Sequence, residues 1–133
     1  MSAKKILIVD DDGHLLLGLA AKLKTHGYAV FSAMDGISAM AVARQEVPDL
    51  VLLDLGLPGG DGFLVLERLR QMTEFVAIPV IVLSARDPAT NKDRALRAGA
   101  VAFFQKPPAN RELLGAIRNA LGEEVALSQF LKT

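Results

Sequence analysis

Five short apolar runs, each followed by polar or turn residues, are the feature that most restricts how this chain can fold. They lie at residues 4–9, 28–33, 50–53, 80–83 and 101–104. Each run is apolar throughout instead of alternating with polar residues, which is typical of parallel strands buried on both faces. The pattern predicts an α/β domain, in which a parallel sheet is covered on both faces by right-handed helical crossovers.

Apolar residues at helical spacing mark a helix after each of these strands. Asp35 is a favoured N-cap for one helix, and Asp87 with Pro88 places a cap and a first-turn proline at the start of another. Asp61 begins the helix that follows the third strand. The five helices are expected at residues 15–23, 38–45, 61–72, 88–98 and 112–121.

Length and composition bound the domain organisation. A chain of 133 residues can bury a full core, so we expect one domain over residues 1–122. Residues 123–133 either extend the last helix or begin a linker. Their apolar residues, at roughly helical spacing, are Val125, Leu127, Phe130 and Leu131.

Composition also excludes several function classes. Lys+Arg 15 balances Asp+Glu 15, which removes the charge argument for direct nucleic-acid binding. With Cys 0, the chain has no disulfide framework, thiolate metal site or cysteine nucleophile. No apolar run has the length of a membrane span or of a signal peptide's core. We therefore expect a soluble, cytoplasmic protein that does not bind membranes.

Polar side chains follow four of the expected strands at the point where each strand ends. They are Asp10, Asp11 and Asp12, then Asp54, Ser84 and Lys106. Because the carboxyl ends of parallel strands lie at one edge of a sheet, these side chains should converge. Clustered carboxylates repel and raise one another's pKa unless a cation sits among them. The available positive charges are a divalent ion and Lys106.

The donor set favours magnesium. Carboxylates, a backbone carbonyl and water oxygens suit Mg²⁺, whereas zinc would need cysteine or more than the two histidines present. Asp10 and Asp11 are candidates for the metal, with a solvated turn as the alternative. Asp12 fits the N-cap of the first helix, and Asp54 alone could equally cap the turn after its strand.

A carboxylate beside a metal, an ammonium group and a hydroxyl is suited to capture a phosphoryl group. The cations neutralise the phosphoryl oxygens, the hydroxyl bonds one of them, and the ionised carboxylate of Asp54 attacks phosphorus. Taken singly, Ser84 could be an ordinary turn hydroxyl and Lys106 an ordinary surface cation. Pro107 biases Lys106 toward an extended backbone, which fixes the direction of the ammonium group.

The chain resembles the receiver domain of bacterial two-component response regulators, from Lys4 to about Leu121. Five motifs in the same order carry the resemblance: Ile8–Asp12, Leu53–Gly62, Leu83–Ala85, Ala98–Ala100 and Lys106–Pro107. The resemblance implies a flavodoxin-like, doubly wound, five-stranded parallel sheet of order 2-1-3-4-5 with five helices. The site then lies between the first and third strands.

The resemblance also assigns roles to site residues. It implies that Asp54 is the phosphoacceptor and, with the Gly56 carbonyl, a ligand of Mg²⁺. Asp11 is implied as a direct ligand, and Asp10 as the holder of a metal-bound water. Ser84 is implied as the switch hydroxyl and Lys106 as the lysine of the family motif. Phe103 falls where the family often has a Tyr or Phe whose side chain rotates. The alternative is that Phe103 is an ordinary aromatic residue of the core.

By the same resemblance, a sensor histidine kinase or a histidine phosphotransfer protein supplies the phosphoryl group. The chain is then not an enzyme for other substrates, because it catalyses its own phosphorylation and dephosphorylation only. The resemblance implies a switching face formed by residues 87–98, 101–104 and the last helix, which controls a partner or output domain and could form a homodimer.

Rival functions are less well supported. A phosphatase with an aspartyl-phosphate intermediate usually needs a second acid at position 56, which is Gly. A flavin carrier would place phosphate against Asp10–Asp12, which would repel it. A receiver-fold interaction module without phosphorylation is the remaining alternative. Gly56 has no side chain to position an attacking water, so we expect a long-lived phosphorylated state.

Overall fold

A computed structural model describes residues 2–57 and 62–123 of the chain. Within them, five parallel strands form one sheet in the order β2-β1-β3-β4-β5. The strands are β1 (Lys5–Val9), β2 (Ala29–Ala33), β3 (Leu50–Leu53), β4 (Val80–Ser84) and β5 (Ala102–Gln105). The predicted fold class and strand order are confirmed.

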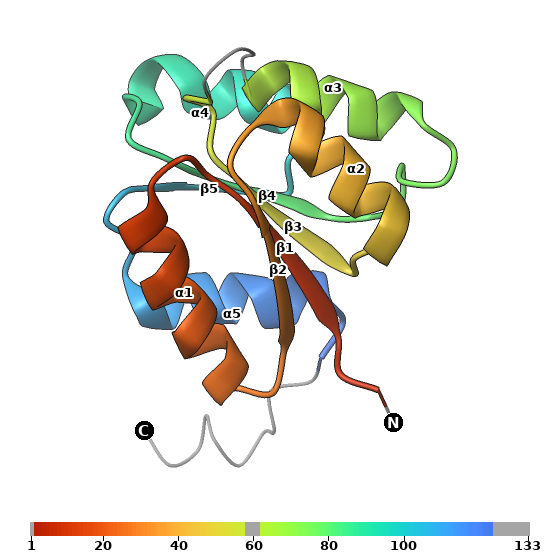
Figure 1. Ribbon diagram of the computed structural model, residues 1–133. Coiled ribbons are helices and arrows are strands. Elements are labelled where there is room, and N and C mark those ends of the chain that lie inside the picture. Colours follow the sequence, from red (N-terminus) through yellow and green to blue (C-terminus); the bar gives the residue numbers. More distant parts are fainter. Residues whose placement is uncertain (1, 58–61, 124–133) are drawn as a thin grey trace.

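Helices cover both faces of this sheet (Figure 1). They are α1 (Gly13–Thr25), α2 (Gly36–Glu46), α3 (Gly62–Gln71), α4 (Pro88–Arg97) and α5 (Asn110–Ala120). Helices α1 and α5 lie on one face, and α2, α3 and α4 lie on the other. This is the doubly wound arrangement that right-handed crossovers between parallel strands produce.

The apolar runs are strands because each side of each strand has a helix layer to pack against. Alternate residues of β1 separate into two core clusters: Leu7 and Val9 face the α2–α3 layer, and Ile6 and Ile8 face α1 and α5. Every residue of β3 is buried. A run that alternated with polar residues would leave charged groups in one of these layers.

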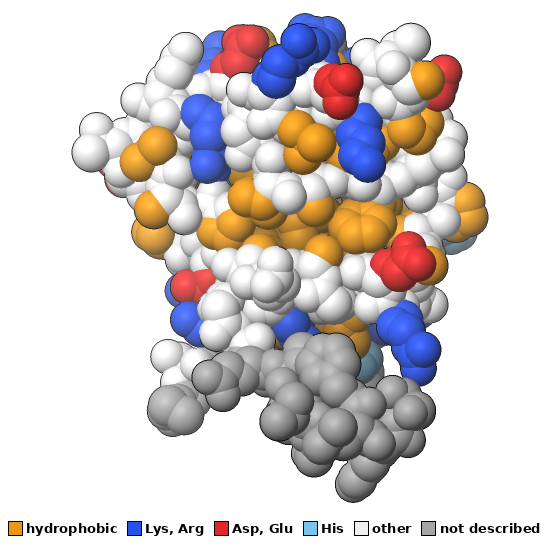
Figure 2. All heavy atoms as spheres, turned by 180° about the vertical axis from the view of Figure 1, so that it is seen from behind, with side chains coloured by type: hydrophobic (Ala, Val, Ile, Leu, Met, Phe, Trp, Pro, Cys, Tyr) orange, Lys and Arg blue, Asp and Glu red, His pale blue; other side chains and the backbone are white. Residues whose placement is uncertain are grey.

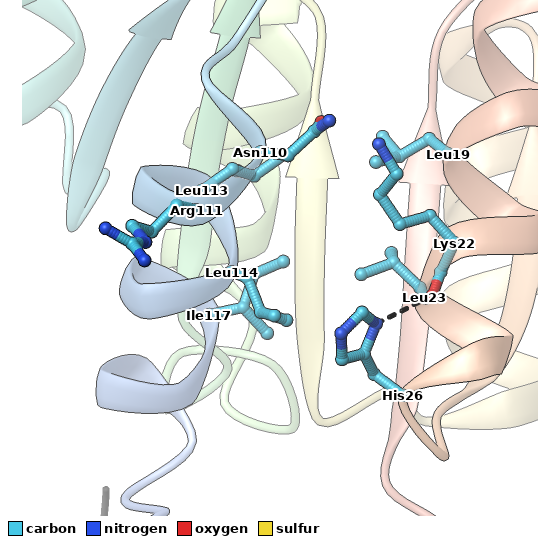
Figure 3. Close-up of a pocket in the computed structure, with 9 residues that line it drawn as sticks. All are labelled: Leu19, Lys22, Leu23, His26, Asn110, Arg111, Leu113, Leu114 and Ile117. Carbon is cyan, nitrogen blue, oxygen red and sulfur yellow. Dashed lines mark hydrogen bonds between the residues drawn. The ribbon is translucent and has the colours of Figure 1, made fainter. Parts of the chain in front are cut away.

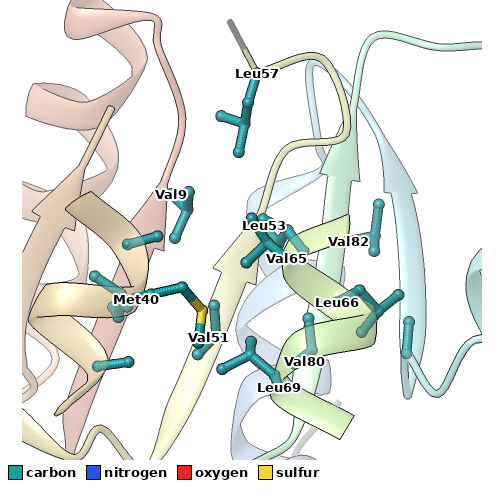
Figure 4. Packing of buried hydrophobic residues seen from close by; sticks show 14 of the residues in the cluster. Val9, Met40, Val51, Leu53, Leu57, Val65, Leu66, Leu69, Val80 and Val82 are labelled. Carbon is teal, nitrogen blue, oxygen red and sulfur yellow. The ribbon is translucent and has the colours of Figure 1, made fainter. Parts of the chain in front are cut away.

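The larger core cluster lies between the sheet and the α2–α3 layer (Figure 4). Met40 of α2 and Leu66 and Leu69 of α3 pack there against β3 and β4. Burial of such side chains contributes roughly 1.5–3 kcal/mol each relative to exposure. The two packed layers hold the strand ends, and therefore the site, in place.

Element boundaries differ from the sequence prediction by one or two residues. Val101 lies in the turn before β5 and is 55% exposed, although its N–H bonds to the Val80 carbonyl at the start of β4. Helix α5 begins at residue 110 and not 112. The predicted caps Asp35 and Asp87 are confirmed, since both side chains accept backbone N–H groups at the start of their helices.

Two predictions fall partly or wholly outside the described residues. The proposed helix start at Asp61 is one, and α3 is described from Gly62. The proposed helix extension or linker at residues 123–133 is the other. Among the helices that the structure describes, none has the length and apolar character needed to cross a membrane.

Candidate functional site

The carboxyl ends of β1 and β3 bring the acidic residues together. The Asp10 N–H bonds to the Ala33 carbonyl at 3.0 Å, and the Asp54 N–H bonds to the Val9 carbonyl at 2.9 Å. These bonds continue the sheet by one residue past the strands, which fixes both backbones. Carboxylate oxygens of Asp10, Asp11 and Asp54 consequently lie within 4.8 Å of one another. Three of the carboxylates expected at this edge of the sheet therefore lie together.

Lys106 enters this cluster from the end of β5. Its ammonium nitrogen Nζ lies 2.6 Å from Oδ2 of Asp10 and 3.5 Å from Oδ2 of Asp54. The Lys106 N–H bonds to the Ser84 carbonyl at 2.8 Å, so the pairing of β4 and β5 also extends one residue past the strands. The lysine is therefore an ion-pair partner of the acids and not an ordinary surface cation.

Burial and charge act against each other in this cluster. Burial raises the pKa of Asp10, and the negative charge of Asp54 adds to that, while hydrogen bonds from Lys106 and the Asp12 N–H oppose it. Burial alone would lower the pKa of Lys106, but its pairing with Asp10 and Asp54 outweighs burial, and the pKa is raised. Three carboxyl groups lie here beside one lysine, an arrangement that a further cation would stabilise.

Asp11 and Asp12 have different positions although they are neighbours. Asp12 caps α1, because its Oδ1 accepts the N–H groups of His14 and Leu15 at 3.1 and 3.2 Å. Asp11 is exposed and shares the acidic cluster. The N-cap interpretation of Asp12 is confirmed. The Asp11 carboxylate does not cap the helix and is available to bind a ligand.

Ser84 lies at the end of β4 and is fully buried. Its hydroxyl oxygen accepts the N–H of Arg86 at 3.0 Å, so it holds the first turn of the loop that leads to α4. Phe103 of β5 is partly buried and packs against the larger core cluster. This packing is common to both interpretations of Phe103, the rotating aromatic and the core aromatic.

Two glycines shape the loop after Asp54. A Cβ on Gly56 would lie 3.8 Å from Oδ2 of Asp54, in ordinary contact, so glycine leaves this side of the carboxylate open. A Cβ on Gly62 would lie 2.3 Å from the Asp54 carbonyl oxygen, closer than any side chain can approach. Position 62 therefore requires glycine, which the sequence prediction missed. A glycine after a turn is the signal for such a close approach between two backbone segments.

A groove between α1 and α5 is separate from the acidic cluster (Figure 3). It has a volume of about 250 Å³, an apolar floor that includes Leu23 and Ile117, and Lys22, His26 and Arg111 at its rim. Figure 3 shows His26 turned back to its own helix, where its Nδ1 pairs with the Lys22 carbonyl. The sequence predicted neither this groove nor its basic rim, because it depends on how the two helices pack.

Known proteins resemble the chain over nearly its whole length. Protein PilH of Pseudomonas aeruginosa is 40% identical over 117 residues, which cover 88% of this chain and 97% of PilH. Transcriptional regulatory protein KdpE of Mycobacterium tuberculosis is 39% identical over 125 residues, which cover 94% of this chain and 54% of KdpE. The chain therefore matches almost all of PilH and about half of KdpE.

A solved structure shares the fold and bears on the acidic site. The receiver domain of sensor histidine kinase PA1611 from Pseudomonas aeruginosa PAO1, with a magnesium ion coordinated in its active site cleft, has a TM-score of 0.81 at 30% identity. The match covers 92% of this chain and 100% of that domain. The response regulator receiver domain family matches residues 6–118. With these motifs, this strand order and this acidic pocket, the chain belongs to the receiver domains of two-component response regulators.

Proposed function

We propose that this receiver domain takes a phosphoryl group onto Asp54 from the phosphohistidine of a sensor histidine kinase or a histidine phosphotransfer protein. A carboxylate oxygen of Asp54 bonds to phosphorus while the bond from phosphorus to the histidine nitrogen breaks, and the imidazole leaves. The observation that carries the proposal is the convergence of Asp10, Asp11 and Asp54 on one point beside Lys106. Asp54 also caps the turn after its strand, because its Oδ1 accepts the Gly56 N–H at 3.3 Å, but its Oδ2 lies beside Lys106.

Mg²⁺ fits this donor set. The acidic cluster offers carboxylate oxygens alone, within 4.8 Å of one another, and this is the hard oxygen environment that Mg²⁺ prefers. In this proposal Asp11 and Asp54 hold the ion directly with the Gly56 carbonyl, and Asp10 acts through a bound water. The ion supplies positive charge that offsets the charge of the transferring phosphoryl oxygens.

Lys106 and Ser84 complete the proposed chemistry. Lys106 already lies 3.5 Å from Asp54, so its ammonium group is placed to pair with a phosphoryl oxygen. The Ser84 hydroxyl now accepts the Arg86 N–H and is free to donate its own proton to that oxygen. Phosphorylation adds about −1.5 to −2 of charge, which both groups would compensate.

The proposed output is a change on the face formed by α4, β5 and α5. Ser84 is joined to the loop before α4 through the Arg86 N–H, so a move of its hydroxyl reaches that helix. Figure 2 views the molecule from behind Figure 1 and shows an apolar band flanked by basic and acidic side chains. Such a surface suits a partner, an output domain or a second copy of the chain.

We also propose that the chain catalyses only its own phosphorylation and dephosphorylation. It acts in the cytoplasm, and this domain contacts neither nucleic acid nor membrane. The open space beside Asp54 at Gly56 supports a long-lived phosphorylated state, because no side chain there positions a water.

Phosphoramidate, which carries phosphorus bonded to nitrogen, tests the proposal without knowledge of the partner kinase. The full chain is incubated with phosphoramidate and Mg²⁺, and intact-mass spectrometry counts the phosphoryl groups gained. We expect one group on the wild type and none on Asp54→Asn, while circular dichroism confirms that both are folded.

Chelation and an exposed neighbour provide the controls. EDTA should abolish uptake by the wild type, and Asp12→Asn should retain it, since asparagine also caps helices. Uptake by Asp54→Asn equal to that of the wild type would refute the assignment. No uptake by folded wild type would favour the interaction module instead.

A further inference from the structure

Arg94 of α4 stacks on a buried aromatic ring of α3. Its guanidinium carbon lies 3.7 Å from the centroid of the Phe63 ring, and Phe63 is 2% exposed. A guanidinium group at this distance gains from both cation–π attraction and stacking. Arg94 lies on an exposed, polar helix, so the sequence alone gives no indication of this contact.

Phe63 is joined directly to the loop that carries Asp54. Its neighbour Gly62 donates its N–H to the Leu55 carbonyl at 2.9 Å. Gly62 also lies so close to the Asp54 carbonyl oxygen that even a Cβ has no space there. A displacement of the loop after Asp54 must therefore displace Gly62, and with it the ring that Arg94 covers.

Helix α4 also packs against β5, and its C-cap Ala98 packs against the larger core cluster. Ala95 is its one buried residue. Past its C-terminal end, Gly99 lies against the Arg70 side chain, whose guanidinium group binds the Val76 and Ile78 carbonyls. The segment just past α4 is thus held by Arg70, and the Arg94–Phe63 contact lies in the last turn of the helix.

We propose that Arg94 is the positioning residue that couples the loop after Asp54 to α4. This inference rests on the proposed phosphorylation of Asp54 and adds a second connection to the one through Ser84. Ser84 is joined to the loop before α4 through the Arg86 N–H, and Arg94 joins the last turn of the helix to Phe63. The two connections together let the state of one loop set the position of the whole helix.

Arg94→Leu removes the guanidinium group and keeps an apolar side chain over Phe63, and Arg97→Leu is the matched control. Arg97 lies about one turn further along the same exposed helix, and its replacement by leucine removes the same charge. Hydrogen exchange of residues 86–98 is measured on the full chain with Mg²⁺, before and after addition of beryllofluoride. Fluorine NMR reports in parallel whether beryllofluoride is bound at the site.

The expected result is that beryllofluoride changes exchange of residues 86–98 in the wild type and in Arg97→Leu. In Arg94→Leu the change falls by at least half while the bound fluorine signal stays. A purely structural Arg94 would raise exchange equally in both states and leave the difference intact, and that result overturns the inference.

A second measurement on the protein without beryllofluoride separates this inference from the proposed function. Arg94→Leu should shift the amide NMR signals of Gly56 and Gly62, and Arg97→Leu should leave them in place. Unshifted signals in Arg94→Leu contradict the coupling whatever the phosphorylation result. A wild type that binds no beryllofluoride counts against phosphorylation of Asp54, while the amide shifts still decide the contact.

Discussion

At the residue scale, the position of Asp54 depends on a neighbour that has no side chain. Gly62 packs against the Asp54 carbonyl and Leu55, and a Cβ there would lie 2.3 Å from the carbonyl oxygen and 2.6 Å from the Leu55 Cα. Both contacts are with backbone, which cannot turn aside as a flexible side chain would. This contact holds Gly62 against the backbone of Asp54 and Leu55, at the start of the loop.

Gly62→Ala should therefore destabilise the fold by about 1–3 kcal/mol, the usual cost of overpacking. Gly115→Ala is the matched control, because Gly115 lies inside α5 with nothing within 4 Å of its Cβ position. That change should stabilise by about 0.5–1 kcal/mol. Urea unfolding measures the free energy of unfolding of both variants. Equal changes would show that the close approach of Gly62 to the Asp54 backbone does not affect stability.

The acidic residues of the site were predictable and their supports were not. Asp10, Asp11 and Asp54 were found from the sequence because strand ends in a parallel sheet share an edge. A glycine after a turn was the one sequence signal for the role of Gly62, and the distance between the two backbones comes from tertiary packing. The Arg94–Phe63 contact likewise needs the relative position of two helices, since an arginine on a polar helix is normally solvated.

At the element scale, α2 ends in a way that its sequence does not favour. Val47 caps the helix in the left-handed conformation, with φ 46° and ψ 71°. It is 55% exposed, so its branched side chain gains little from packing there. The sequence prediction ended this helix at residue 45 and did not foresee a strained valine at its C-cap.

Val47→Asn should stabilise the protein by about 1 kcal/mol, because asparagine tolerates this conformation and an ordinary residue loses about 1–2 kcal/mol in it. Val47→Ala keeps the Cβ and should gain less. Thermal unfolding of the two variants ranks them. A lower melting temperature for Val47→Asn than for the wild type would show that the valine is not strained.

The end of α5 is joined to the start of β2 by one side-chain hydrogen bond. The Tyr28 hydroxyl donates to Oε1 of Glu123 at 2.9 Å. Burial, followed by this bond and the negative charge of Glu123, raises the pKa of Tyr28 above its ordinary value. A raised pKa in the folded state stabilises the protein below the unfolded pKa of about 10, and the contribution is lost as pH rises through the folded value.

Tyr28→Phe should therefore be less stable than the wild type at pH 8 by about 0.5–1.5 kcal/mol, the net contribution of one hydrogen bond. The difference should shrink as pH rises above 10, because the wild type loses this contribution and the variant has none to lose. Urea unfolding across this pH range measures both. A difference that does not change with pH would exclude the titration of Tyr28 as its cause.

At the scale of the whole molecule, the sheet gathers chemistry from four distant parts of the chain. Residues 10–11, 54 and 106 meet in the acidic cluster because strand order 2-1-3-4-5 places β1 and β3 side by side, with β4 and β5 next to them. Ser84 is joined to Lys106 through the backbone. The order itself came from the family resemblance, whereas apolar periodicity predicted only the parallel α/β class. The α1–α5 groove and the contacts of α4 depend on tertiary packing, which neither apolar periodicity nor the family resemblance predicts.

Magnesium binding by the full chain, measured by isothermal titration calorimetry at fixed pH, tests the central claim that three carboxylates share one ion. We predict one site in the wild type. Asp11→Asn and Asp54→Asn should each weaken it by about tenfold or more, because charged ligands set the affinity of such sites. Asp12→Asn, one residue from Asp11, should bind as the wild type does. Equal affinity for Asp11→Asn and the wild type would contradict the account.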